Sequence, residues 1–209
     1  MGFDQSYWEK NYSEPDSMDG IGNAKEHASY AKAFFTLEEV AITSIIDLGF
    51  GYAHLLKAFA HAFKPKIIQG IEPSAYAYEK AKKTIFAKKR NVKLKKIELK
   101  DWVSIEANPI DLAICSSVMQ YISDAELIKI IPRLAERVRY LYLTVPTDIE
   151  LDKQVREHGF KDDYALYRTQ AFYYKILSPH FTVVGNRILE SKYYFNEYST
   201  HFSDLFYRF

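Results

Sequence analysis

Cysteine is almost missing from this sequence, because Cys115 is the only one among 209 residues. A single thiol excludes a disulfide framework and a cysteine-rich metal site, so we expect a reducing, cytoplasmic setting. No apolar run approaches the roughly 18 residues that a membrane-spanning helix needs. The charged, aromatic N-terminus is also unlike a signal peptide. We therefore expect no membrane partner.

An excess of charge of one sign is missing as well, since the formal net charge is +1. Domains that bind nucleic acids are typically basic, and this balance argues against such a partner. One basic run, from Lys80 to Lys100, is interleaved with apolar positions. A solvated helix face explains that run better than phosphate contacts do. No histidine pair has metal-ligand spacing with a partner acid, so we predict no metal.

What the chain does have is enough apolar sequence, 48% of its residues, for one good core. We therefore predict a single domain over residues 1–209. Within it, residues 1–40 should form an N-terminal flap and helix, and residues 147–180 an insertion that covers the substrate. Strongly aromatic segments lie at both ends of the chain and are candidates to wall a pocket.

The most informative stretch is 45–56, where an apolar run containing Asp47 passes into Gly49, Phe50 and Gly51 and restarts with helical spacing. This pattern indicates a strand, a tight turn and a helix. Glycine accepts positive φ and lets a ligand approach the backbone closely. Because His54 stands where a dinucleotide fingerprint has its third glycine, the turn favours a nucleoside without a pyrophosphate. A purely structural turn would show the same pattern.

The order of apolar segments predicts alternating strands and helices. Strands are expected at 44–48, 67–72, 92–99, 109–116, 139–145 and 181–189, with a further strand in the C-terminal tail. Helices are expected at 24–40, 51–64, 73–87, 124–137 and 169–177, with a loop over 147–167. This alternation predicts an α/β fold built on a parallel sheet.

Acids stand at the predicted ends of two strands. Glu72, followed by Pro73, ends the second strand, where a carboxylate can accept hydrogen bonds from both hydroxyls of a ribose. The alternative is an ordinary acid near a helix N-terminus. Asp101 and Trp102 follow the expected third strand. A core tryptophan after a turn aspartate is the alternative for that pair.

The motif Asp47-x-Gly49-x-Gly51-x-Ala53 resembles the first motif of class I S-adenosylmethionine (SAM) dependent methyltransferases, and 109–124 resembles their fourth. The match is to the small-molecule enzymes, similar to methyltransferase types 11 and 12. The resemblance implies a Rossmann-like, doubly wound, seven-stranded sheet in three α/β/α layers, mostly parallel with an antiparallel last strand. It also implies SAM as cofactor and S-adenosylhomocysteine (SAH) as product. It implies that Asp101 accepts from the adenine amine, that Trp102 lies at the ring edge, and that Ser116 and Val118 lie near the methionine end. The implied cofactor-binding set is Tyr12, Tyr30, Asp47, Gly49, Phe50, Gly51, Glu72, Pro73, Asp101, Trp102, Ser116 and Val118.

The resemblance implies in-line SN2 transfer of a methyl group to a small-molecule acceptor. A general base is optional for such a transfer, and His27 and His158 are the candidates because both fall in segments expected to cover the strand ends. An RNA or protein methyltransferase that uses the basic run is one alternative, and a catalytically inactive SAM-binding scaffold is another. We expect a monomer or a homodimer.

Overall fold

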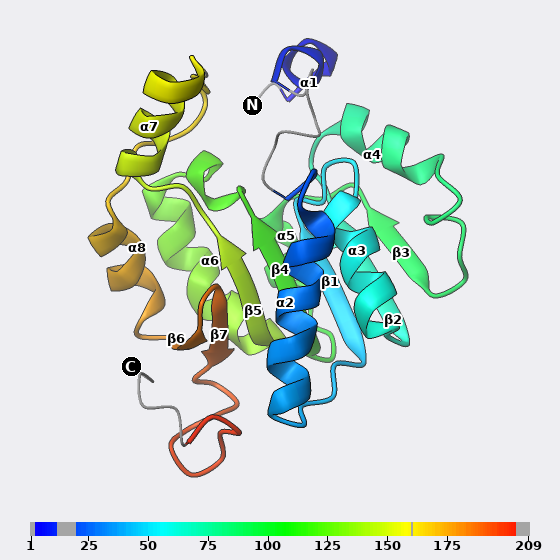
Figure 1. Ribbon diagram of the computed structural model, residues 1–209, viewed down its shortest axis with the longest axis vertical. Helices are drawn as coiled ribbons and strands as arrows, with labels where there is room; N and C mark the ends of the chain where they lie inside the picture. The colour runs from blue at the N-terminus through cyan, green and yellow to red at the C-terminus, as the bar shows by residue number, and fades with distance from the viewer. Residues whose placement is uncertain (1–2, 12–19, 160, 204–209) are drawn as a thin grey trace.

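The computed structural model describes residues 3–11, 20–159 and 161–203, which form a seven-stranded sheet between layers of helices (Figure 1). The strands lie in the order β3-β2-β1-β4-β5-β7-β6. Their bounds are β1 Ser44–Leu48, β2 Ile67–Ile71, β3 Val92–Lys95, β4 Ile110–Ser116, β5 Val138–Thr144, β6 Phe181–Gly185 and β7 Ile188–Ser191. The helices are α1 Gln5–Asn11, α2 Ala24–Leu37, α3 His54–Phe63, α4 Ala75–Lys82, α5 Leu99–Val103, the short 3₁₀ helix η2 Met119–Tyr121, α6 Asp124–Arg137, α7 Asp148–His158 and α8 Gln170–Leu177.

The strand directions confirm the predicted fold class. β1 pairs in parallel with β2 and β4, β2 with β3, and β4 with β5. Strand β7 is antiparallel to both β5 and β6. The chain winds outward in one direction from β1 to β3 and in the other from β4 onward. A crevice is expected where the order reverses, at the carboxyl ends of β1 and β4.

The core lies on both faces of the sheet. Every residue of β1 is buried, as is typical of a central parallel strand covered on two sides. On one face α2 contributes Phe35, which packs against Tyr140 of β5, and α3 contributes Phe59, which packs against Tyr142. On the other face α5, α6 and α8 pack around Trp102 and Leu134. In the part of the chain described here, no helix is long and apolar enough to cross a membrane.

The expected third strand over 92–99 is wrong in its second half. Strand β3 ends at Lys95, and α5 begins at Leu99. The buried residues of α5 are Leu99, Trp102 and Val103, which have the i, i+3, i+4 spacing of one helix face. The predicted strand therefore extends four residues beyond the end of β3, over the connection to α5 and its first residue.

Two C-terminal expectations also need correction. The expected strand over 181–189 is a hairpin, in which β6 and β7 are joined by Asn186 and Arg187 after Gly185. Arg187 has a φ of +67°, a conformation common in tight hairpin turns. The expected loop over 147–167 instead begins with α7, whose first turn carries Asp148 and Glu150 and whose C-cap is Gly159 with a φ of +61°. No strand follows β7 within residues 192–203.

Candidate functional site

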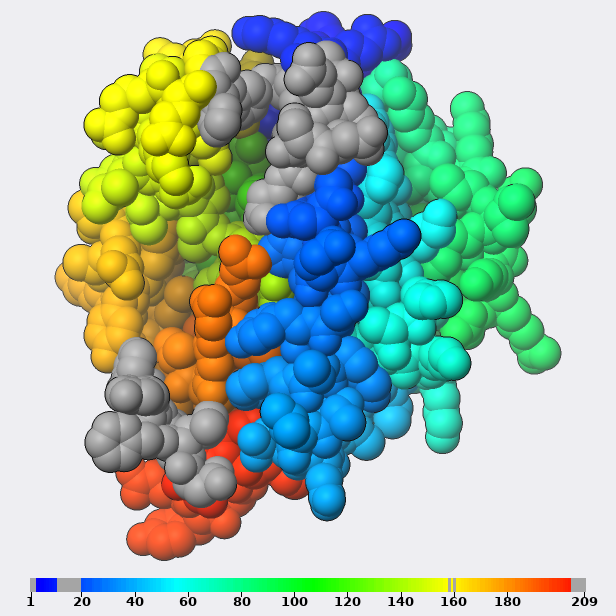
Figure 2. Space-filling model, in the orientation of Figure 1, coloured from blue at the N-terminus to red at the C-terminus, as the bar shows by residue number. Residues whose placement is uncertain are grey.

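A cavity of about 1420 Å³ lies at the carboxyl edge of the sheet. Its floor is formed by the segments that follow β1, β2, β4 and β5. Helices α1 and α7 contribute further lining residues, as do the first turns of α3, α4 and α5 and the N-terminal half of α6. Figure 2 shows α1 lying across the top of the molecule between α7 and α4. The cavity therefore occupies the crevice that the strand order predicts.

The turn after β1 depends on glycine. Gly49 has a φ of +84°, and a Cβ atom at this position would lie 2.5 Å from Cγ2 of Val118. The N–H groups of Gly49 and Phe50 donate to the carbonyl oxygen of Ile71 at 2.8 and 3.1 Å. Gly51 also has a positive φ, +54°. The turn is thus held between β2 and the loop after β4, with its backbone at the cavity surface.

Glu72 is buried directly beside this turn, with 4% of its surface exposed. One carboxylate oxygen accepts from the N–H of Gly51 and the other from the N–H of Ser74, both at 2.9 Å. Each carboxylate oxygen has a second lone pair that a ligand hydroxyl could use. Burial raises the pKa of Glu72, and the two N–H donors oppose that shift. The carboxylate is held in one orientation at the cavity.

Asp47 is also buried at the cavity floor. Burial, followed by the negative charge of Glu72, raises the pKa of Asp47 to about 8. Near neutral pH the ligand-free protein therefore keeps a proton on this carboxyl group. A positively charged ligand would favour its ionised form.

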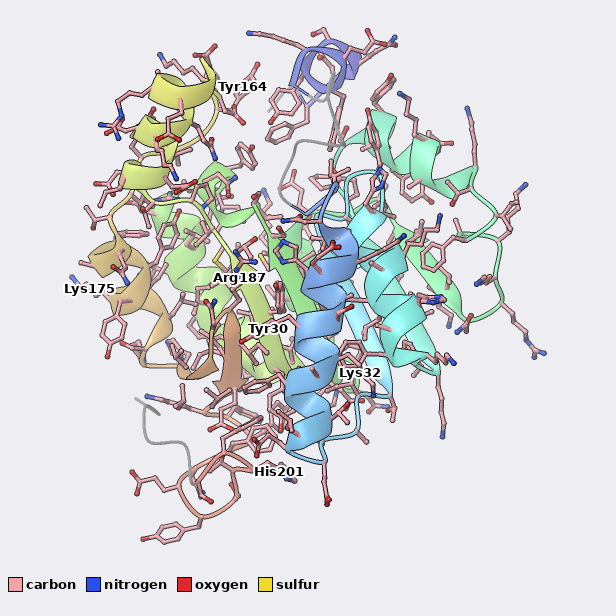
Figure 3. The ribbon with its side chains drawn as sticks, in the orientation of Figure 1. Tyr30, Lys32, Tyr164, Lys175, Arg187 and His201 are labelled. Carbon is pink, nitrogen blue, oxygen red and sulfur yellow. The ribbon has the colours of Figure 1, made fainter. Side chains whose placement is uncertain are left out.

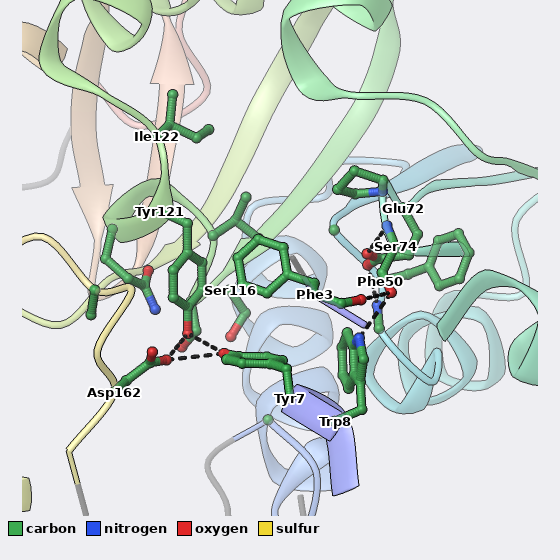
Figure 4. A pocket seen from close by; sticks show the side chains of 18 of the residues that line it. Phe3, Tyr7, Trp8, Phe50, Glu72, Ser74, Ser116, Tyr121, Ile122 and Asp162 are labelled. Carbon is green, nitrogen blue, oxygen red and sulfur yellow. Dashed lines mark hydrogen bonds between the residues drawn. The ribbon is translucent and has the colours of Figure 1, made fainter. Parts of the chain in front are cut away.

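The N-terminal segment is bound to two sides of the cavity. On the β2 side, Trp8 Nε1 donates to Ser74 Oγ at 2.9 Å, and Ser74 Oγ donates to the carbonyl oxygen of Phe3 at 2.6 Å. On the other side, the Tyr7 hydroxyl donates to Asp162 Oδ2 at 3.0 Å. Figure 4 shows both sets of contacts. Helix α1 thus bridges walls that are far apart in the sequence.

The wall after β4 is built from polar side chains. Ser116 Oγ and Thr144 Oγ1 are 2.7 Å apart. The Tyr121 hydroxyl donates to Asp162 Oδ2 at 2.6 Å. Gln120 directly precedes Tyr121 in the sequence. It is 3% exposed and also lines the cavity.

Eight residues of the predicted cofactor set line this one cavity. Strands β1, β2 and β4 bring them together from three parts of the chain, and their ligand roles stay predictions. They are Asp47, Gly49, Phe50, Gly51, Glu72, Pro73, Ser116 and Val118.

Asp101 and Trp102 do not line the cavity. Asp101 is exposed on α5, and Trp102 is a core residue whose ring lies 4.7 Å from the guanidinium of Arg137. Because β3 ends early, the residues that reach the cavity here are Glu98, Leu99 and Lys100. The structure thus places Trp102 in the core, and the adenine-binding roles of Asp101 and Trp102 stay predictions.

Tyr30 and His27 lie elsewhere too, at a second cavity of about 280 Å³. His27 Nδ1 is 2.5 Å from the Tyr142 hydroxyl and 3.0 Å from Nη1 of Arg187. Helix α2 runs along the face of the sheet, so these positions face β5 and the β6–β7 turn. Figure 3 places Tyr30 and Arg187 well away from Tyr164 at the top of the molecule.

The two remaining predicted residues fall near or beyond the described parts of the chain. Tyr12 lies outside the described residues, and His158 is the last residue of α7. Within the described residues, no group of three His, Cys, Asp or Glu side chains could hold a metal ion.

Sequence reasoning missed several polar residues of the cavity. Ser74, Gln120 and Asp162 are not among the predicted site residues, although Asp162 falls in the segment 147–180 that is expected to cover the substrate. Ser74 follows Glu72-Pro73 at the start of α4, where a serine is a common N-cap, so its position could have been found. Asp162 reaches the cavity through contacts with residues far away in the chain, which no local signal shows.

Comparison with known proteins agrees with this geometry. Residues 45–140 match the family model of a methyltransferase domain. No curated protein matches the chain.

Solved structures share the fold at low sequence identity. Magnesium protoporphyrin IX methyltransferase (ChlM) from Synechocystis PCC 6803 with bound SAH has a TM-score of 0.60 and 18% identity, over 89% of this chain and 92% of that one. A SAM-dependent methyltransferase from Clostridium acetobutylicum ATCC 824 has a TM-score of 0.65 and 10% identity, over 89% and 96%. The plantazolicin methyltransferase BpumL in complex with SAH has a TM-score of 0.67 and 14% identity, over 85% and 70%.

Proposed function

Because the chain carries a class I SAM-dependent methyltransferase domain, we propose that it transfers a methyl group from SAM to a small-molecule acceptor bound in the large cavity. The observation that carries this proposal is the size of the cavity, about 1420 Å³. Pockets for drug-sized ligands have volumes of roughly 300–1,000 Å³. There is room for the cofactor and for a second small molecule beside it.

The residues at the cavity floor suit the cofactor. Gly49 and Gly51 allow its close approach to the backbone, and the fixed carboxylate of Glu72 accepts hydrogen bonds from the ribose hydroxyls. Bound SAM supplies a methyl group activated by the sulfonium. A lone pair of the acceptor forms the new bond to the methyl carbon as the carbon–sulfur bond breaks, and SAH remains.

The main work of the protein is then to position the acceptor and exclude water. Correct orientation alone can lower a barrier by roughly 7–11 kcal/mol. Helix α1 covers the cavity and is bound on both sides by Trp8 and Tyr7. Since His27 lies at the second cavity, we do not assign it as a base. A role for His158 stays a prediction.

The neighbours and the basic run bear on the acceptor. Some of the neighbours are named for magnesium protoporphyrin IX and plantazolicin, and BpumL has been crystallised with a desmethylPZN analogue. Of the basic residues from Lys80 to Lys100, Lys100 alone lines the cavity, and it is paired with Glu98 at 2.7 Å and Glu126 at 3.6 Å. These observations favour a small acceptor over RNA.

Calorimetry with SAM, SAH and NAD tests the cofactor first. We expect micromolar binding of SAM and SAH and none of NAD. The acceptor class is tested by incubating the protein with SAM labelled in the methyl group and a cell extract, which is then separated into small-molecule, RNA and protein fractions. Label in the small-molecule fraction supports the proposal, and label confined to RNA or protein contradicts it. SAM binding without any transfer would favour the scaffold alternative.

A further inference from the structure

Gln120, at the wall of the large cavity, carries a buried hydrogen-bond acceptor without a partner among the described residues. The residue is 3% exposed and lines the cavity from η2. Its backbone carbonyl accepts from the N–H of Leu166 at 2.9 Å, which fixes the main chain here. Within residues 3–11, 20–159 and 161–203, no donor reaches its side-chain oxygen Oε1. Because buried polar atoms are nearly always hydrogen-bonded, this oxygen points to a ligand that donates.

Asp162 presents a second acceptor on the same wall. Its Oδ2 accepts from the hydroxyls of Tyr121 and Tyr7, and its Oδ1 accepts from the N–H of Tyr164 at 3.0 Å. A carboxylate has about four acceptor positions, so Oδ1 can take one further donor. Figure 4 shows Asp162 and the two tyrosine hydroxyls together at one side of the cavity.

Aromatic rings stand beside this carboxylate. The ring of Phe3 lies edge-on to Tyr121 and to Tyr7, at centroid distances of 5.1 and 4.9 Å. Rings of this kind attract a cation at their faces. A carboxylate next to tyrosine rings is therefore a favourable environment for a positively charged group.

The charges around the cavity point the same way. Apart from Asp47, which keeps its proton near neutral pH, carboxylates outnumber lysines six to two among the described lining residues, and Lys100 is already paired with Glu98 and Glu126. An anionic acceptor would be repelled by this field, whereas a cation would be attracted to it. The residues that carry these carboxylates are Asp4, Glu72, Glu98, Glu126, Glu150 and Asp162.

Resting on the proposed function, we propose that the methyl acceptor is a small molecule that carries a protonated amine, which is held at the wall formed by Gln120, Tyr121 and Asp162. A different atom of the acceptor, one with a free lone pair, attacks the methyl carbon as the carbon–sulfur bond breaks. An ammonium group has only donors, which matches the free acceptor of Gln120 and the carboxylate of Asp162. A carboxylate or phosphate would have no donor for either group. Gln120 and Asp162 thereby determine the class of acceptor.

Three probes with the same ring and different charges test this preference. The protein is saturated with SAH and titrated with tyramine, which is a cation, tyrosol, which is neutral, and 4-hydroxyphenylacetate, which is an anion. We expect tyramine to bind about tenfold or more tightly than tyrosol, a difference of about 1.4 kcal/mol, and the anion not to bind. Equal binding of all three, a preference for the anion, or no binding of tyramine up to millimolar concentration would overturn the proposal.

SAM and SAH also carry an ammonium group, which could bind at the same wall. Matched variants therefore distinguish an effect on acceptor binding from an effect on cofactor binding. Asp162→Asn removes the charge but keeps an oxygen that the two tyrosines can donate to, and should weaken tyramine about tenfold. Asp163→Asn is the control, because Asp163 is exposed and lies 3.7 Å from Lys161. SAH binding should stay within about twofold in both variants. A parallel loss of SAH affinity in Asp162→Asn would assign the wall to the cofactor and overturn the inference.

Gln120→Met tests the buried oxygen. This change keeps the size of the side chain and removes the unsatisfied acceptor, so the melting temperature should stay the same or rise while tyramine binds a fewfold more weakly. Unchanged tyramine affinity would contradict a role for Gln120. If wild-type protein does not bind SAH at all, the proposed function itself fails. If SAH binds and the probes show no charge preference, only this inference fails.

Discussion

The two walls of the large cavity are built in different ways. The wall formed by the ends of β1 and β2 is held by backbone groups, as in the bond from the Gly51 N–H to Glu72, which are 21 residues apart. The wall formed by the β4 loop and the segment after α7 is held by side chains. There Tyr7 contacts Asp162, 155 residues away. The first wall follows from strand pairing, and its hydrogen-bonding groups suit any ligand that contains a ribose. The second depends on three separate segments and is where the choice of acceptor can vary.

The largest effect is expected from a substitution in the wall formed by the ends of β1 and β2. Gly49→Ala places a Cβ atom 2.5 Å from Val118 at a φ of +84°. We expect SAH affinity to fall more than about a hundredfold, or roughly 2.7 kcal/mol, because the turn must move to relieve the contact. Calorimetry with SAH measures the loss. Gly159→Ala is the control, since Gly159 also has a positive φ, +61°, but a Cβ there meets nothing within 4 Å. Normal binding in Gly49→Ala would show that the turn does not need glycine.

A second prediction concerns pH and the floor of the same wall. Burial raises the pKa of Asp47 to about 8, so the folded protein keeps this proton while the unfolded chain loses it above a pKa near 3.8. The folded state binds more protons in this window, and the contribution of Asp47 to stability therefore falls as pH rises from about 4 to about 8. The fall is at most about 1.4 kcal/mol per pH unit.

Asp47→Asn removes this titration. In denaturant unfolding of ligand-free protein, the variant should lose less stability than wild type between pH 5 and pH 7. Parallel stability curves for the two proteins would show that Asp47 is ionised in the folded state. The same experiment with saturating SAM should reduce the difference, because a bound cation favours the carboxylate.

Glu72→Ala should weaken SAH binding by about 1.5–3 kcal/mol, the range for a hydrogen bond to a charged group. The variant also leaves the N–H groups of Gly51 and Ser74 without their acceptor. Glu79→Ala is the control on the exposed side of α4. Unchanged affinity in Glu72→Ala would remove Glu72 from the cofactor site.

The difference between the walls also explains what could be predicted from the sequence. The strand Ser44–Leu48 and the helix over 124–137 have the predicted bounds, because an apolar run and its flanking residues are local signals. The glycine turn and Glu72 follow directly from those strands. The predicted end of the third strand is wrong because the five residues of α5 are too few to show a helical period clearly. Helix α7 was missed because it is polar on most of its surface.

The second wall could not be predicted in the same way. Tyr7, Tyr121 and Asp162 come from segments far apart in the sequence and meet only in the tertiary structure. No spacing in the sequence relates these residues to one another. For the same reason, the sequence does not show that Tyr30 and His27 lie at the second cavity, because the position of α2 on the face of the sheet depends on its packing against α3 and β5.

The smallest expected effects come from α1, which contacts both walls and can distinguish them. Trp8→Phe removes the hydrogen bond to Ser74 beside Glu72, and Tyr7→Phe removes the bond to Asp162. Each bond is worth about 0.5–1.5 kcal/mol. We therefore expect Trp8→Phe to weaken SAH binding a fewfold. Tyr7→Phe should leave SAH binding unchanged and weaken tyramine a fewfold in the SAH-saturated protein. If each variant weakened both ligands equally, α1 would act only as a common cover, and the two walls would not be separate in function.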